Sequence, residues 1–173
     1  PGPQPESKFK FEILSTEQTS VSFRITPVDT TIPYVAMIID KPYFDEFDTD
    51  DDYIYDDLAW FEEEAMYNEQ TLEEYLSGFL KTGVVEDSTD GLTPNTEYYL
   101  YAYQLTSTGE ILTDLEKVLF TTKDYDKVDV TFEVSVSDIQ YKGATINVKP
   151  SKNDATYFIN AFTQEQVDEW SSG

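Results

Sequence analysis

The sequence contains no cysteine and no histidine among its 173 residues. Without cysteine there are no disulfides, thiolate nucleophiles or thiolate metal ligands. Without histidine there is no Ser/His/Asp or Cys/His catalysis, no imidazole zinc site and no histidine general base. Paired carboxylates of the glycosidase kind remain, but among 35 acids no pair stands out from the others. We therefore expect a protein that is not an enzyme and that holds no cofactor or metal.

Basic residues are also scarce. The chain has 11 Lys and Arg against 35 Asp and Glu, which gives a formal charge of -24. Nucleic acid and anionic membrane surfaces would repel such a chain, so neither is expected as a direct partner. Hydrophobic residues at 39% and aromatic residues at 15% nevertheless predict a folded protein. No apolar run approaches the roughly 18 residues of a membrane span.

The first residues, PGPQPES, have the composition of a linker, which we place at residues 1–7. The chain begins at Pro1 without a methionine. We expect that an initiator or signal segment preceded it, and we interpret this as a hint of export.

The sequence repeats itself over nearly 40 residues, with a shared apolar phase, a proline and a tyrosine. The matched segments are Phe11–Ile13 with Phe132–Val134 at an offset of 121, and Val21–Pro27 with Ala144–Pro150 and Tyr34 with Tyr157 at an offset of 123. Two residues inserted in the turn between the first two strands would account for the change of offset.

The repeat predicts the domain boundaries. A first domain covers residues 8–123, a short linker covers 124–127, and an incomplete second repeat covers 128–173, with only its first three strands. Some 46 residues rarely bury enough surface to be stable alone. We expect either that the chain is cut from a longer one or that the second repeat pairs with a neighbouring molecule.

Short segments with alternating apolar and polar residues predict β-strands in the first domain. The segment 32–39, IPYVAMII, is apolar on both faces, so both sides of that strand must be covered. The predicted strands are 8–14, 20–26, 32–39, 95–105 and 117–122. Short strands separated by turns predict a mainly β fold, an antiparallel sandwich.

A long acidic insertion, at about residues 42–90, separates the third predicted strand from the fourth. Asp45 to Glu74 contains 14 acids. Two amphipathic helices are predicted within it. Helical spacing of apolar residues marks the first, and a Thr71-x-x-Glu74 capping box begins the second, with Gly83 as its stop. The apolar residues of the first helix are Ile54, Leu58, Phe61 and Ala65.

The segment GLTPNTEYYLYAY, residues 91–103, combines a turn with alternating aromatic residues. Tyr98, Leu100 and Ala102 share one face of the predicted strand and should face the core. Tyr99, Tyr101 and Tyr103 share the opposite face. The two helices need an apolar surface to cover, so we expect them to bury much of Tyr99 and Tyr101.

The spacing Leu92-x-Pro94-x-Thr96-x-Tyr98 resembles the signature of fibronectin type III domains before their sixth strand. The resemblance implies an immunoglobulin-like sandwich in which the Tyr98 hydroxyl meets upstream backbone and Leu92 closes the end of the core. Ile25-Thr26-Pro27 occupies the place of the family's usual Trp-x-Pro, with Ile25 in place of the tryptophan. Phe120-Thr121-Thr122 is similar to the family's last strand.

Two ligand hypotheses rest on particular residues. Asp48, Asp50 and Asp52 fall at positions 1, 3 and 5 of an EF-hand loop, but Tyr53 stands where the turn needs glycine and Ala59 where the bidentate glutamate belongs. A solvated helix entry is the favoured interpretation. Aromatic stacking of a sugar on Trp60 or Tyr99 is the second hypothesis, whereas core packing is the usual fate of such rings.

Tandem fibronectin-like units behind a Pro-rich leader are similar to surface lipoproteins of anaerobic Gram-negative gut bacteria. The resemblance implies a non-catalytic binding or structural module, an adhesin or spacer, on the cell surface of an exported, lipid-anchored protein. A carbohydrate-binding module and an accessory domain of a larger secreted enzyme are the alternatives. The partner, protein or glycan, and the ligand-binding residues are not identified by the sequence.

Overall fold

The computed structural model describes residues 6–125, 129–154 and 156–171, with side chains as far as residue 169. The chain divides into two compact units, Pro1–Tyr125 and Asp126–Gly173. Of the two predicted linkers, residues 1–5 and 126–127 lie outside the described residues.

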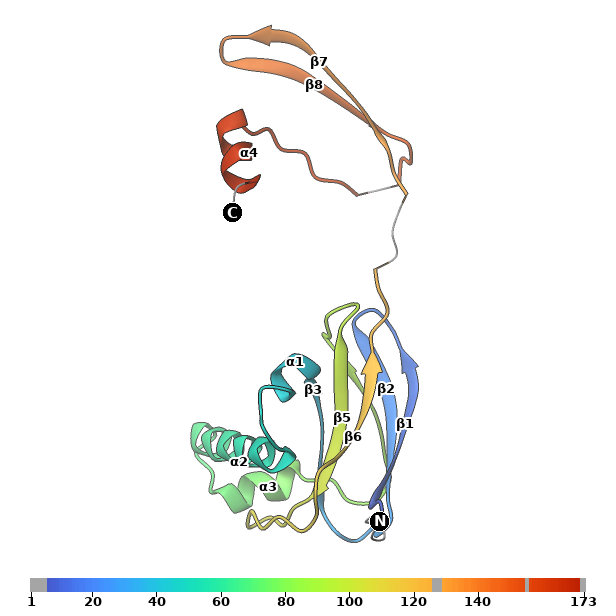
Figure 1. Ribbon diagram of the computed structural model, residues 1–173, viewed down its shortest axis with the longest axis vertical. Coiled ribbons are helices and arrows are strands. Elements are labelled where there is room, and N and C mark those ends of the chain that lie inside the picture. The colour runs from blue at the N-terminus through green and yellow to red at the C-terminus, as the bar shows by residue number, and fades with distance from the viewer. Residues whose placement is uncertain (1–5, 126–128, 155, 172–173) are drawn as a thin grey trace. The chain divides into compact units, whose positions relative to one another are not determined.

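The first unit contains two antiparallel three-stranded sheets (Figure 1). One sheet has the order β1-β2-β4 and the other has the order β3-β5-β6. The mainly β class predicted from the sequence is therefore confirmed. The strands are β1 (Phe9–Thr16), β2 (Ser20–Pro27), β3 (Tyr34–Asp40), β4 (Val85–Asp90), β5 (Glu97–Gln104) and β6 (Glu116–Thr121).

A hydrophobic cluster joins the two sheets, and strand alternation determines which residues enter it. In β2 every second residue is buried, which is the period of a strand with one covered face. In β5, Tyr98, Leu100 and Ala102 belong to the same cluster, as their predicted position on the core side of the strand requires. The buried members of this cluster are Phe9, Val21, Phe23, Ile25, Tyr34, Tyr98, Leu100, Ala102 and Phe120.

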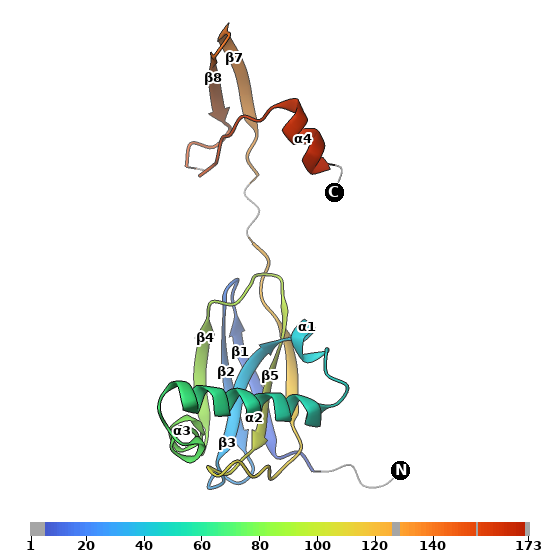
Figure 2. The ribbon, with the colours of Figure 1, turned by 90° about the vertical axis from the view of Figure 1, so that its left-hand side faces the viewer.

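Three helices cover the other face of the sheet β3-β5-β6: α1 (Lys41–Phe44), α2 (Asp50–Tyr67) and α3 (Leu72–Phe79). Figure 2 shows α2 lying across that sheet. Capping boxes begin the two longer helices, Thr49 with Asp52 and the predicted Thr71 with Glu74. Each box satisfies backbone N–H groups that the first turn of a helix leaves without a partner.

The burial of the tyrosines under the helices is confirmed. Tyr101 and Tyr103 have no exposed surface, and Tyr99 is half-buried in the same cluster. Strand β3 is covered on both sides, as its doubly apolar sequence predicts, because Tyr34 lies in the cluster between the sheets and Val35 lies in the cluster under the helices.

The turn before β5 has the predicted backbone contact. The backbone N–H of Thr93 donates a hydrogen bond of 2.9 Å to the Tyr98 hydroxyl. Leu92 packs, partly buried, against the cluster between the sheets. The side chain of Tyr98 thus ties the turn to the strand that follows it.

The helical insertion is shorter than predicted. Helix α3 ends at Phe79, and its C-cap residue, Leu80, already has an extended backbone. The prediction that Gly83 stops this helix is therefore wrong. Gly83 lies in the connection that follows, with a φ of +70°. Residues 85–90 then form β4, which pairs with β2. The sequence of β4, VEDSTD, is polar and lies at the sheet edge, so it lacks the alternation that would have revealed a strand.

The second unit begins with a hairpin of β7 (Phe132–Gln140) and β8 (Gly143–Pro150). Over its first five pairs, this hairpin has the register of the β1–β2 hairpin. Phe9 pairs with Pro27 in the first, and Phe132 pairs with Pro150 in the second. The two copies therefore align at a constant offset of 123. The offset of 121 and the insertion of two turn residues were wrong.

Two further contacts recur at the same offset. Val28 N–H bonds to the carbonyl of Lys8, and Ser151 N–H bonds to the carbonyl of Thr131, both at 2.8 Å. The rings of Phe9 and Tyr34 have centroids 5.3 Å apart, and those of Phe132 and Tyr157 have centroids 5.2 Å apart. The repeat is therefore one of structure as well as of sequence.

The third strand predicted for the second repeat is not formed among the described residues. The segment 156–163 has no strand pairing, and it leads into helix α4 (Gln164–Ser171). In the first unit the equivalent strand, β3, pairs with β5. The described part of the second unit contains no counterpart of β5, so the segment has no ladder to join.

Candidate functional site

A buried carboxylate, Asp57, lies between helix α2 and the sheet β3-β5-β6. It is 5% exposed. Helical spacing places it on the same side of α2 as Tyr53 and Phe61, four residues before and after it, and both are buried. The apolar face that packs α2 onto the sheet thus carries one ionisable group into the core.

Three tyrosine hydroxyls surround this carboxylate. Tyr101 donates to it at 3.0 and 2.9 Å from the two oxygens, and Tyr103 donates to Oδ2 at 3.2 Å. Tyr53 donates to the Tyr101 hydroxyl at 3.1 Å. Tyr101 and Tyr103 point to the same side because they are two residues apart in β5, and their rings stack with centroids 6.4 Å apart. We call Asp57 and these three tyrosines the Asp57 cluster.

Burial raises the pKa of Asp57 to about 6, although the hydrogen bonds from the tyrosines oppose this shift. Burial, reinforced by the nearby carboxylate, also raises the pKa of Tyr53, Tyr101 and Tyr103. At neutral pH the cluster is therefore a carboxylate held by neutral phenols. No buried side-chain polar atom of the described residues lacks a hydrogen-bond partner.

The Asp57 cluster can exchange a proton near pH 6, but it is closed to substrates. None of its four side chains is more than 5% exposed. What the arrangement does is connect helix α2 to strand β5 through directional bonds in a low-dielectric core. Its geometry supports a role in fixing the position of the helix on the sheet.

Two of the acids at the start of α2, Asp50 and Asp52, have partners within the protein. The Asp50 carboxylate accepts from Lys117 Nζ, with both oxygens at 2.7 Å, and Lys117 Nζ also lies 4.5 Å from the ring centroid of Phe44. Asp52 accepts from the backbone and the hydroxyl of Thr49 in the capping box. Within the described residues no group of three acidic side chains is placed to hold a metal.

The two aromatic residues considered for sugar stacking lie in different surroundings. Tyr99 is packed edge-on by Phe44 at 5.2 Å and has Lys117 Nζ 5.7 Å from its ring centroid. Trp60 is 39% exposed on α2, where it contacts Phe61 and Phe79. Tyr67, two helical turns further along α2, is 85% exposed. Trp60 and Tyr67 are therefore both exposed on α2, whereas Tyr99 is half-buried among its neighbours.

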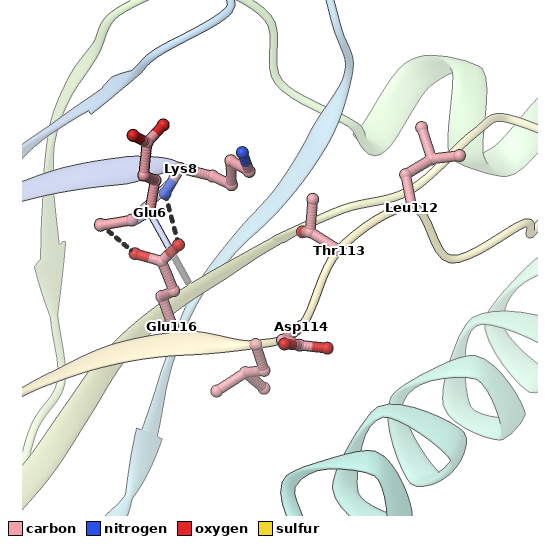
Figure 3. Close-up of a pocket in the computed structure, with 8 residues that line it drawn as sticks. Glu6, Lys8, Leu112, Thr113, Asp114 and Glu116 are labelled. Carbon is pink, nitrogen blue, oxygen red and sulfur yellow. Dashed lines mark hydrogen bonds between the residues drawn. The ribbon is translucent and has the colours of Figure 1, made fainter. Parts of the chain in front are cut away.

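A surface pocket of about 450 Å³ lies where the chain enters β1 and β6 (Figure 3). The backbone N–H of Lys8 donates to Glu116 at 2.5 Å, and the Ser7 hydroxyl bonds to the same carboxylate. Figure 3 shows the carboxylates of Glu6 and Asp114 pointing in different directions rather than toward a common point. The pocket thus brings together acids without making a convergent site.

No sequence motif marks Asp57 as a site residue, and Tyr53 enters the sequence argument only as a mismatch to an EF-hand loop. A signal was present, because Asp57 stands three residues after Ile54 and four before Phe61, inside the predicted apolar stripe. An acid at such a position predicts a buried carboxylate with hydrogen-bond donors opposite. Composition does not distinguish Asp57 among the 14 acids from Asp45 to Glu74.

Comparison of the chain with known protein families, with curated proteins and with solved structures gives no match in any of the three. Among the helices in the described part of the chain, none has both the length and the apolar character that crossing a membrane requires.

Proposed function

We propose that this chain is a non-catalytic binding or structural module of a cell-surface protein, an adhesin or spacer of an exported bacterial lipoprotein. We further propose that its first unit is an immunoglobulin-like, fibronectin type III-like sandwich with a helical insertion. The Leu92-to-Tyr98 motif, the Thr93–Tyr98 hydrogen bond and the apolar cluster shared by two sheets support this fold.

The observation that carries the functional proposal is the structural repeat at an offset of 123. The second unit repeats the paired hairpin of the first, together with its ring contact between a phenylalanine and a tyrosine. Repetition of a framework adds reach or further contact surfaces rather than new chemistry. This pattern favours a module that positions or presents something.

The charge of the chain supports the same interpretation. A formal charge of -24 keeps a module soluble and opposes its adsorption to nucleic acid or to anionic lipid surfaces. Asp57, the one carboxylate of the described residues with a large pKa shift, is enclosed by Tyr53, Tyr101 and Tyr103. The raised pKa of Asp57 is therefore explained by its burial in the core and not by a role toward a substrate.

A carbohydrate-binding module is the second candidate, and one observation favours it. Trp60 and Tyr67 are seven residues apart on α2, a spacing that puts them on one side of the helix, and both are exposed. Glu63 lies between them on that side. Exposed aromatic rings beside a carboxylate suit a sugar, which offers apolar faces and hydroxyl donors. An accessory domain of a larger secreted enzyme is a third candidate without a specific observation behind it.

Two measurements test these proposals. Antibody labelling of intact source cells, before and after external protease, checks the surface location; labelling that requires permeabilised cells would contradict it. A glycan array probed with the purified chain separates the first two candidates. A structural or protein-binding module gives no saturable binding. A sugar-binding module gives binding that Trp60→Ala and Tyr67→Ala abolish and that Tyr125→Ala, an exposed tyrosine outside α2, leaves intact.

A further inference from the structure

The side of helix α2 that faces away from the sheet carries large apolar side chains. Tyr55 is 63% exposed and Met66 is 74% exposed. With Ala59, which is also exposed, they have the spacing i, i+4, i+11, which places residues along one side of a helix. In Figure 2 the side of α2 away from the sheet faces the viewer, and no other described helix or strand of the first unit crosses in front of it. We call this side the α2 outer face; it consists of Tyr55, Ala59, Glu62, Glu63, Met66 and Tyr67.

The α2 outer face is negatively charged. Helix α2 contains eight acids and no base, and no lysine or arginine occurs from residue 42 to residue 80. Glu62, Glu63 and Glu64 belong to none of the ion pairs found in the described residues. The face therefore combines exposed apolar surface with negative charge that no cation of the described residues neutralises. An exposed apolar patch with a polar border marks an interaction surface.

A surface hollow of about 500 Å³ lies at the end of this face, lined by Glu63, Glu64, Met66 and Tyr67. Two carboxylates and an aromatic ring around one hollow suit the cationic group of a lysine or arginine, because the carboxylates pair with the cation and the ring attracts it. The Met66 side chain is flexible and can follow the aliphatic part of such a residue. The hollow therefore favours a partner with a basic side chain next to an apolar one.

We propose that the α2 outer face binds a basic amphipathic helix of another protein. The apolar residues of that helix pack along Tyr55, Ala59 and Met66, while its lysines or arginines face Glu62 and Glu63 and enter the hollow. This inference rests on the proposed function, because it gives the binding module a partner of stated chemistry.

Geometry and charge favour this occupant over others. From Tyr55 to Met66 the face is a convex ridge of roughly 16 Å, about three turns of helix, and the small side chain of Ala59 lets a second helix approach closely. Small ligands such as sugars bind mostly in concave sites. A second copy of the chain would bring the same negative charge to the face and be repelled, as would nucleic acid or an anionic lipid surface.

Titration with a model peptide tests the proposal. The probe is a fluorescently labelled peptide of leucine and lysine, as long as the 18 residues of α2, with its leucines at helical spacing. At an ionic strength of about 0.15 M, which screens long-range attraction, the whole chain should bind this peptide saturably and one to one. A peptide of the same composition whose leucines share no side of a helix should bind about tenfold more weakly. Equal binding of the two peptides would show attraction by net charge alone and would overturn the proposal, as would the absence of saturable binding.

Two pairs of variants locate the binding on the face. Glu63→Lys should weaken it by about tenfold, while Asp90→Lys, an equal change of charge at an exposed residue of β4, should not. Met66→Ser should also weaken it by about tenfold, while Val28→Ser, at a residue that is 75% exposed, should not. All four positions are exposed, so these variants should keep the fold. Equal effects within either pair would overturn the proposed face.

Failure of this inference is distinguishable from failure of the proposed function. A chain that is not at the cell surface would be revealed by the labelling of intact cells, and the peptide titration would be unchanged. Saturable binding of a glycan that depends on Trp60, without binding of the basic peptide, would assign this side of α2 to a sugar. That result would overturn the inference and leave a binding module in place.

Discussion

Tyr101 donates its hydroxyl hydrogen to the carboxylate of Asp57, whose oxygens lie 3.0 and 2.9 Å away. The two residues are 44 positions apart in the chain, and their contact joins β5 to α2 inside the core. At the start of α2, Asp50 also pairs with Lys117 of β6, whereas the buried residues Ile54 and Phe61 make apolar contacts that tolerate small displacements. The Asp57 cluster has directional bonds, so it selects one position of the helix on the sheet.

Replacement of Asp57 by alanine should destabilise the protein. It removes the acceptor of two buried hydroxyls, those of Tyr101 and Tyr103, and buried donors without partners are costly. We expect the free energy of unfolding to fall by about 1–3 kcal/mol, measured by urea denaturation. Glu62→Gln, an exposed acid on the same helix, is the control and should change stability by less than about 0.5 kcal/mol. An Asp57→Ala variant as stable as the control would show that the bonds contribute nothing.

The raised pKa of Asp57 predicts a pH dependence of a definite sign. The native state binds this proton more tightly than the unfolded state, because the pKa rises from 3.8 to about 6 on folding. Its contribution to stability is therefore full below pH 3.8, is lost as the pH rises through about 6, and is flat above that. The difference amounts to about 3 kcal/mol.

Asp57→Asn tests this sign, because the asparagine cannot titrate. Between about pH 4 and about pH 7 the wild type should lose about 3 kcal/mol of unfolding free energy relative to this variant. Glu62→Gln should follow the wild type. Glu74, whose pKa is lowered by hydrogen bonds from Thr71, acts in the opposite direction at lower pH and affects all three proteins equally. If the unfolding free energies of the wild type and Asp57→Asn changed in parallel with pH, the raised pKa assigned to Asp57 would be wrong.

Alternation and helical spacing were enough to predict much of the first unit. The strands around Phe23 and Leu100, the two longer helices, and the burial of Tyr101 all follow from the period of apolar residues. Strand β4 and helix α1 could not be predicted in this way. The first is a polar edge strand, and the second is a single turn begun by Asp40, too short to show a period.

The repeat illustrates a different limit. Phe11 and Phe132 match in sequence, but the pairing of Phe132 with Pro150 shows that Phe132 is the equivalent of Phe9. In an alternating strand, a shift of two residues preserves the apolar phase, so the sequence pattern alone accepts either alignment. The hydrogen-bond register distinguishes them. The Asp57 cluster had the same limitation, since only the structure shows which of many acids faces the tyrosines.

Removal of the Tyr98 hydroxyl should cost stability without loss of the fold. Tyr98→Phe keeps the ring, which stacks on Phe120 at 5.7 Å, but it leaves the Thr93 N–H without its acceptor. We expect a loss of about 1 kcal/mol in the free energy of unfolding. Faster hydrogen exchange at the Thr93 amide should accompany it. Tyr125→Phe, at an exposed position, is the matched control. An equal loss of stability in both variants would show that the Thr93–Tyr98 hydrogen bond is not its cause.

The capping box at Thr49 offers the last test, because it controls how α2 begins beside the sheet. The Thr49 hydroxyl accepts from the backbone N–H of Asp52 at 3.1 Å, and Asp52 accepts in return from the backbone N–H of Thr49 at 3.1 Å. Thr49→Ala removes the first bond and should lower the free energy of unfolding by about 1 kcal/mol. Ser77→Ala, an exposed position inside α3, should be neutral or slightly stabilising because alanine is the better helix former.

The same variant separates local fraying from loss of the whole helix. Because Asp57 lies two turns inside α2, its bonds to Tyr101 and Tyr103 should survive Thr49→Ala. Hydrogen exchange should therefore quicken in the first turn of α2 and stay slow around Asp57. If exchange quickened equally along α2, the helix would be held as one unit by its N-terminal cap, and the anchoring role assigned to the Asp57 cluster would be wrong.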